Sequence, residues 1–207
     1  ETVSGLDDTR AVAALSAALG SPFAVTGAAH RPADGGTPAR TFVRLEGFQA
    51  SVADRSARLA GELASFGPSE RVDGDASETL WRTVRDVEFL GDAEKLPIWR
   101  ISTRPSDAPA IVESIRRNFD CHALYDWGGG LIWLAGGDSD DGGAAVVRSA
   151  VAAVSGYATL VRAPSDIRAA VAVFQPLDPA VMALTKRLKE TFDPVGVLNP
   201  GRMYEGI

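Results

Sequence analysis

The last residues of the chain place an amide and a guanidinium group in a turn whose shape the neighbouring residues restrict. Asn199-Pro200-Gly201-Arg202 follows a helical run that ends near Phe192. Pro fixes φ and Gly permits a left-handed conformation, so the two polar side chains are held in defined directions. An amide both donates and accepts hydrogen bonds, and a guanidinium stabilises negative charge. The turn is a candidate contact for a polar, anionic cofactor; the alternative is a helix stop followed by a surface loop.

Charged side chains also share faces within two expected elements. The alternation of apolar and polar residues over Thr41–Gly47 predicts a strand with one buried face, so Arg44 and Glu46 lie together on its polar face. Arg44 can bind a carboxylate in bidentate fashion, and the alternative is an ion pair with Glu46. Arg82 and Arg85 lie three residues apart on an expected helix. They either contact an anionic substrate, with Arg85 as the candidate, or form a solvated helix face.

The chain has two histidines, His30 and His122. Imidazole suits general-base chemistry near neutral pH. His30 is expected at a strand end before a loop rich in Gly and Pro, so it is the candidate catalytic base, whereas His122 is expected to be structural. Trp127 precedes three glycines and is a candidate wall of a substrate site, with core packing as the alternative. Two scattered histidines and the single cysteine, Cys121, predict neither a metal site nor an iron–sulfur cluster.

Composition restricts the possible partners. The chain has 207 residues and a formal net charge of -6, which argues against nucleic acid as a partner. One cysteine favours a reducing compartment, so we expect a cytoplasmic protein. The longest apolar run, Leu131–Ala135, is too short to cross a bilayer. The chain begins Glu1-Thr2-Val3 without a methionine, and we therefore expect a fragment or a processed chain.

The order of expected elements repeats and predicts an α+β fold with two β-α-β-β-α-β units. In the first unit, residues 1–74, we expect strands at 2–6, 22–26, 41–47 and 70–73 and helices at 7–19 and 51–66. Residues 75–95 contain a connecting helix that reaches about Leu90. In the second unit, residues 96–163, we expect strands at 96–102, 121–127, 131–135 and 157–161, helices at 106–118 and 144–154, and a loop at 136–143. Residues 164–207 hold a helix from Asp178 and a docking tail. This order is typical of duplicated ferredoxin-like units with helices over one face of an antiparallel sheet.

Four stretches of the chain resemble a known family. LKETFDPVGVLNPGRMY (Leu188–Tyr204) resembles the C-terminal signature of FAD-linked oxidases of the vanillyl-alcohol-oxidase type. Three further stretches resemble, more narrowly, the FAD-binding E subunits of bacterial glycolate oxidases: RLEGFQASVADR (Arg44–Arg55), LWRTVRDV (Leu80–Val87) and YDWGGGLIWL (Tyr125–Leu134).

The resemblance implies that the chain is the C-terminal cap domain of a two-part FAD protein. An N-terminal FAD domain would lie upstream of Glu1, because Gly128–Gly130 falls in an expected hairpin and not in a phosphate-binding loop. FAD would then belong to the parent protein and would not be retained by this chain. The resemblance also implies that Asn199–Arg202 lies beside the flavin, and that glycolate or a similar 2-hydroxy acid is the substrate.

The same resemblance implies partners: the chain's own N-terminal FAD domain, a sister FAD subunit and an iron–sulfur subunit, with membrane association through that complex. Dehydrogenases of the broad family often carry a metal-binding histidine cluster in the cap, which this chain lacks. The parent therefore either takes part in the oxidation or relays electrons and supports the complex. The alternative function is a non-catalytic module that docks subunits or binds a small ligand. We expect the isolated chain to be inactive, and its residues after Pro194 to be mobile or packed against a neighbouring molecule.

Overall fold

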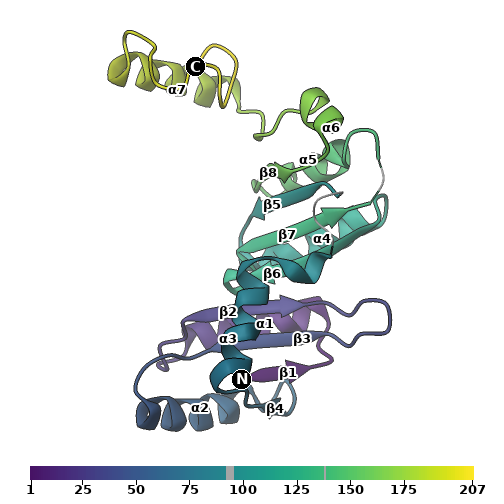
Figure 1. Cartoon of the computed structure of the whole chain (residues 1–207), viewed down its shortest axis with the longest axis vertical. Coiled ribbons are helices and arrows are strands. Elements are labelled where there is room, and N and C mark those ends of the chain that lie inside the picture. Colours follow the sequence, from purple (N-terminus) through teal and green to yellow (C-terminus); the bar gives the residue numbers. More distant parts are fainter. Residues whose placement is uncertain (92–95, 138) are drawn as a thin grey trace.

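The computed structural model describes residues 1–91, 96–137 and 139–207. Its strands form one antiparallel sheet in the order β4-β1-β3-β2-β6-β7-β5-β8 (Figure 1). The first four strands of the chain occupy one half of this sheet and the last four occupy the other half. The α+β class and the antiparallel sheet agree with the sequence-based expectation.

The first half follows the order β-α-β-β-α-β. Its strands are β1 (Thr2–Ser4), β2 (Gly27–Arg31), β3 (Arg40–Arg44) and β4 (Ser69–Glu70), and its helices are α1 (Asp8–Gly20) and α2 (Gln49–Leu63). Asp7 caps α1 by accepting a hydrogen bond from the backbone N–H of Arg10. Apolar residues of α1 and α2 pack on one face of these strands, with Leu15, Leu59 and Leu63 fully buried.

The second half has the same order of elements. Its strands are β5 (Ile98–Ser102), β6 (Cys121–Asp126), β7 (Leu131–Gly136) and β8 (Tyr157–Arg162), and its helices are α4 (Ala108–Arg116) and α5 (Ala144–Ala152). Short 3₁₀ turns, η2 (Pro105–Asp107) and η3 (Trp127–Gly129), precede α4 and join β6 to β7. Alternate strand residues such as Ile101 and Ile132 pack against Ile111 and Val147 from the two helices, so this half has a core of its own.

The connecting segment crosses the opposite face of the sheet. α3 (Gly74–Arg85) places Leu80, Trp81 and Val84 against Ala29 and Phe42 of the first half. The turn η1 (Glu88–Leu90) then packs Leu90 against strands of the second half. The sheet is thus covered by four helices on one face and partly by α3 and η1 on the other.

After β8, a short helix α6 (Ser165–Ala170) leads to α7 (Pro179–Phe192). Figure 1 shows α7 projecting away from the sheet at the end farthest from α2. Tyr204, near the C-terminus, connects the tail to β8, because its hydroxyl forms a hydrogen bond with that of Tyr157 at 2.7 Å. Within the described ranges, no helix is long and apolar enough to cross a membrane.

Several expected boundaries differ from the structure. The strand expected at Pro22–Thr26 is wrong: β2 begins at Gly27, and Ala24 has a left-handed φ of 50° that interrupts an extended chain. The connecting helix ends at Arg85, because Val87 is also left-handed, with φ 59°. The expected strand at 70–73 is shorter and earlier. Positions 92–95 of the connecting segment and position 138 of the expected 136–143 loop lie outside the described residues.

Candidate functional site

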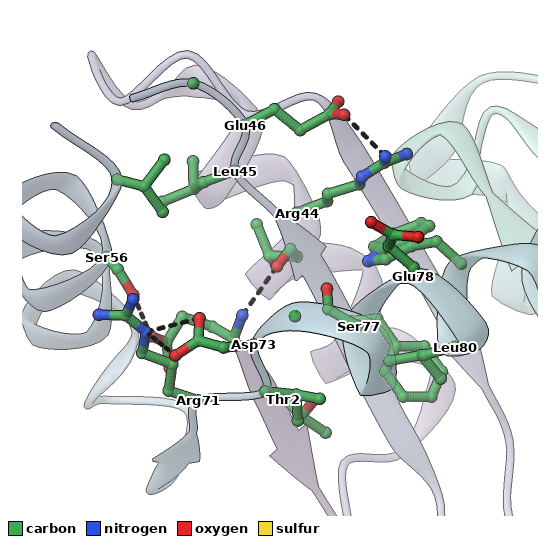
Figure 2. A pocket seen from close by; sticks show the side chains of 18 of the residues that line it. Thr2, Arg44, Leu45, Glu46, Ser56, Arg71, Asp73, Ser77, Glu78 and Leu80 are labelled. Carbon is green, nitrogen blue, oxygen red and sulfur yellow. Dashed lines mark hydrogen bonds and ion pairs between the residues drawn. The ribbon is translucent and has the colours of Figure 1, made fainter. Parts of the chain in front are cut away.

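A cleft of about 550 Å³ lies on the first half of the sheet, beside the end of β3. The start of α2, the segment before α3 and the first turns of α3 form its other walls. Figure 2 shows Arg44 and Glu46 on one side of the cleft and Arg71 and Asp73 on another. Arg44 and Glu46, which the sequence predicted to share the polar face of one strand, therefore both line this cleft, although β3 ends at Arg44 and Glu46 follows it.

The position of Arg44 depends on a glycine and a tryptophan. Gly27 of β2 lets the Trp81 ring lie against the sheet, since a Cβ at Gly27 would stand 2.9 Å from Cη2 of that ring. The guanidinium of Arg44 then lies over the ring, 5.7 Å from its centroid. α3 supplies Trp81, so the packing of this helix on the sheet holds the substrate-binding candidate in place.

Both arginines of the cleft are already paired with carboxylates. Arg44 Nη2 donates to Glu46 Oε1 at 2.7 Å, and Arg71 Nε donates to Asp73 Oδ1 at 2.9 Å. The Arg44 and Glu46 side chains are 36% and 51% exposed, and exposed ion pairs contribute only about 0.2–1 kcal/mol. A ligand carboxylate can therefore replace Glu46 on the guanidinium fork at small cost.

Arg85 and Trp127 lie outside the cleft. Arg85 is at the last turn of α3, where its Nε and Nη2 donate to both oxygens of Asp86 at 2.7 and 2.8 Å. These hydrogen bonds, which Arg85 donates to Asp86, raise the pKa of Arg85 and lower the pKa of Asp86. Trp127 belongs to η3 in the second half of the sheet, is 63% exposed and has Arg100 over its ring at 5.5 Å.

His30 is fully buried in the sheet. Its Nε2 is 3.3 Å from Asp8 Oδ1 and its Nδ1 is 2.9 Å from Thr41 Oγ1. A carboxylate only accepts, so Nε2–H points to Asp8, and in the neutral ring Nδ1 accepts from the Thr41 hydroxyl. Both ring nitrogens thus have partners inside the protein. His30 lies next to the end of β2, as expected, but its ring is enclosed there.

Asn199, Pro200, Gly201 and Arg202 form an exposed turn after α7. Asn199 and Gly201 have left-handed φ values of 47° and 71°, as the turn chemistry predicted for glycine. Asp193 holds the start of this turn by accepting from Lys189 Nζ at 2.6 Å and from the backbone N–H groups of Val197 and Leu198 at 3.0 and 2.8 Å.

The predicted site residues therefore occupy separate places. The cleft at α2 and α3 and the turn after α7 lie at opposite ends of the molecule (Figure 1). Trp127 is in the second half of the sheet, and His30 is buried. Sequence reasoning missed Arg71 and the role of Trp81; the stretch LWRTVRDV contains Trp81 and was the signal that could have revealed it. In the part of the chain that the structure describes, no three His, Cys, Asp or Glu side chains are arranged to hold a metal ion.

Comparison with known proteins gives two findings. Residues 169–203 match the family model described as "FAD linked oxidases, C-terminal domain". The chain is also 31% identical over 163 residues to "Glycolate oxidase subunit GlcE" of Escherichia coli (strain K12). The resemblance to FAD-linked oxidases is confirmed.

These matches cover different extents of the chain. The family model covers α7 and the turn at 199–202, whereas the similarity to GlcE covers 79% of the chain. The chain spans 38% of the length of that relative. Together the findings support a C-terminal domain of an FAD-linked oxidase that is similar to GlcE, and they imply FAD in the parent protein.

Proposed function

We propose that the chain is the cap domain of an FAD-dependent oxidoreductase that acts on glycolate or a similar 2-hydroxy acid. The observation that carries this proposal is the similarity to a glycolate oxidase subunit over 79% of the chain. In each half the strand order places the first and third strands at the centre, which supports a duplicated ferredoxin-like fold. We assign residues 1–74 and 96–163 to the two units, 75–95 to the connection and 164–207 to the docking tail.

The residues present fit one edge of FAD but not its pyrophosphate. Gly128 and Gly129 are buried against α1, so their backbone is not open to a phosphate. Asn199 and Arg202, in contrast, lie in an exposed turn and offer an amide and a guanidinium. When bound, FAD supplies the two-electron acceptor. This chain would contribute contacts at the ring edge, and an upstream domain would hold the rest of the cofactor.

α7 supports this docking role. Val181, Leu184, Leu188 and Phe192 are about half exposed or more along the helix. Large apolar side chains in such a row are typical of surfaces that bind another protein. We infer that the upstream FAD domain covers these side chains. We further infer that the parent protein belongs to a cytoplasmic complex with a sister FAD subunit and an iron–sulfur subunit, and that this complex can associate with the membrane.

For the substrate, we assign Arg44 as the carboxylate-binding residue, with Glu46 as the partner that the substrate displaces. Trp127 would act only if the second half of the sheet also faces the substrate, and Arg85 only if the last turn of α3 does. A general-base role for His30 does not enter the proposal, because its ring is enclosed.

The flavin content of the isolated chain tests whether another domain of the parent protein binds the FAD pyrophosphate. We expect the purified 207-residue chain to lose added FAD on desalting, because Gly128 and Gly129 are buried and we identify no other pyrophosphate site among the described residues. Retention of stoichiometric flavin would contradict the assignment of that site to another domain.

Replacement of Arg44 in the flavin-containing parent tests the substrate site. Arg44→Gln removes a charge-assisted bond worth about 1.5–3 kcal/mol, so kcat/KM for glycolate should fall at least about tenfold. Arg58→Gln is the matched control, since Arg58 is an exposed arginine on α2 that pairs with Asp54. Equal turnover by both variants would remove Arg44 from the site and favour the non-catalytic alternative, in which the chain docks subunits or binds another small ligand.

A further inference from the structure

The two halves of the sheet meet at a seam with little backbone pairing. β2 and β6 share one register pair, His30 with Tyr125. In contrast, β6 pairs with β7 from Cys121 to Asp126, along its whole length. Each half also has its own buried core. The backbone ladder therefore does little to fix one half relative to the other, and side chains must supply the rest.

Asp8, in the first turn of α1, gathers side chains from both halves. The Tyr125 hydroxyl of β6 donates to Asp8 Oδ2 at 2.7 Å, and Arg116 Nη1 of α4 lies 3.3 Å from the same oxygen. His30 of β2 approaches Oδ1 at 3.3 Å. One carboxylate of the first half thus binds two side chains of the second half.

The surroundings of Asp8 and Tyr125 keep Asp8 ionised and Tyr125 protonated. Burial raises the pKa of Asp8, but hydrogen bonds from His30 and Tyr125 and the charges of His30 and Arg116 outweigh burial and lower it. Burial and the nearby Asp8 raise the pKa of the Tyr125 phenol. Asp8 therefore remains an ionised acceptor and Tyr125 remains a donor.

The glycines after Trp127 bring α1 close to the second half. A Cβ at Gly128 would stand 2.4 Å from Leu19 Cδ1, and one at Gly129 would stand 3.1 Å from Val12 Cγ2. Both glycines have left-handed φ values, 68° and 99°. Val12 packs within the core of the second half although it belongs to α1. The glycine-rich turn is therefore a packing surface for α1 across the seam.

On the other face, the connecting segment already ties the halves together. Phe89 of η1 packs both against Ala29 and Phe42 of the first half and against the cluster around Leu124 of the second. His122 Nδ1 and Asp34 Oδ2 also meet across the seam at 2.8 Å. Contacts on this face do not involve Asp8, so they persist if the cluster on the α1 face is broken.

We propose that Asp8, with Tyr125, Arg116 and the Gly128–Gly129 turn, forms a joint that holds the two halves at a fixed angle. Without the Asp8 carboxylate, the seam becomes a hinge that opens on the face covered by α1 and pivots about η1. Each half stays folded, because its internal strand pairs lie outside the joint and most of its core does too; Tyr125 and Val12 are the core members that lie at the joint. This inference does not depend on the proposed oxidoreductase function.

Spin-label distances between α2 and α5 test the joint. Both helices lie on the α1 face, one in each half, and Ala57 and Ser149 are exposed positions for cysteine labels in a Cys121→Ala background. In the otherwise unchanged chain we expect one narrow distance distribution. Asp8→Asn and Tyr125→Phe should broaden it and shift it to longer distances.

Asp7→Asn is the matched control, since Asn also caps a helix and, among the described residues, the Asp7 side chain bonds only the Arg10 N–H of its own turn. It should leave the distribution narrow. If Asp8→Asn does not fold, the milder Tyr125→Phe decides the result. A distribution as narrow in the folded Tyr125→Phe variant as in the parent chain would overturn the proposal, and so would equal broadening in Asp7→Asn.

Discussion

Asp193 shows how one carboxylate shapes the tail. The hydrogen bond from Lys189 and those from the Leu198 and Val197 N–H groups lower the pKa of Asp193 from 3.8 to about 2. These bonds close the turn between α7 and Asn199-Pro200-Gly201-Arg202. The orientation of the candidate flavin contacts therefore depends on a residue that lies outside the contact turn itself.

The lowered pKa of Asp193 predicts that the turn after α7 loses stability in acid. Because the pKa is lower in the folded chain than in the unfolded chain, the carboxylate stabilises the turn fully above about pH 4 and loses this effect as pH falls through about 2. In an NMR titration, the amide protons of Val197 and Leu198 should shift with a midpoint near 2. Asp193→Asn should abolish this titration, and a midpoint near 4 in the unmodified chain would contradict the bonding described.

Among the helices, α2 contains a glycine that serves no packing role. Gly61 lies in the last turn of α2, and a Cβ there would meet no atom within 4 Å. Glycine in a helix is about 0.5–1 kcal/mol less favourable than alanine. We expect Gly61→Ala to raise the free energy of unfolding by about that amount, measured by urea denaturation.

Gly136 at the end of β7 gives the opposite expectation. A Cβ at Gly136 would stand 2.3 Å from Phe119 Cζ, so Gly136→Ala must displace a buried ring and should lower the free energy of unfolding by about 1–3 kcal/mol. The two substitutions add the same methyl group and so control for each other. A destabilised Gly61→Ala variant would show that the end of α2 is not helical in solution.

Elements with a strong apolar period were predictable from sequence. The buried face of α2 followed from Leu59 and Leu63, because burial on one side imposes the helical period. The strand around Phe42 was predictable, but its single buried face was wrong: Phe42 packs under α3 while Val43 packs under α1 and α2, so both faces of β3 are covered. β2 was not predictable, since Gly27-Ala28-Ala29 carries no β-branched or aromatic residue, and its strand forms through pairing with β3. The cleft was predictable only in part. Alternate spacing placed Arg44 and Glu46 on one side of the chain, although β3 ends at Arg44, and Trp81 reaches the cleft only through the packing of α3.

At the scale of the molecule, the sheet domain buries most of its large apolar side chains, while α7 and the residues after it expose theirs. Tyr204 bonds Tyr157 and the Gln175 carbonyl, so one residue of the tail contacts the rest of the chain. That the residues after Pro194 are mobile or pack against a neighbouring molecule stays a prediction. Leu184 and Leu188 of α7 nevertheless remain 55% and 50% exposed. A surface of this kind favours association whenever its proposed partner domain is absent.

We therefore expect the isolated chain to self-associate through α7 as its concentration rises. The double variant Leu184→Glu, Leu188→Glu should stay monomeric in analytical ultracentrifugation, because charges on the stripe oppose its burial. Its stability should change by less than about 0.5 kcal/mol per site, as is usual for exposed positions.

Phe48→Glu is the control. Phe48 is 89% exposed but lies at the start of α2, at the other end of the molecule, so this variant should associate like the parent chain. Two outcomes would contradict this prediction: a monomeric Phe48→Glu variant, or a double variant that still associates. Either would show that the self-association surface is not on α7.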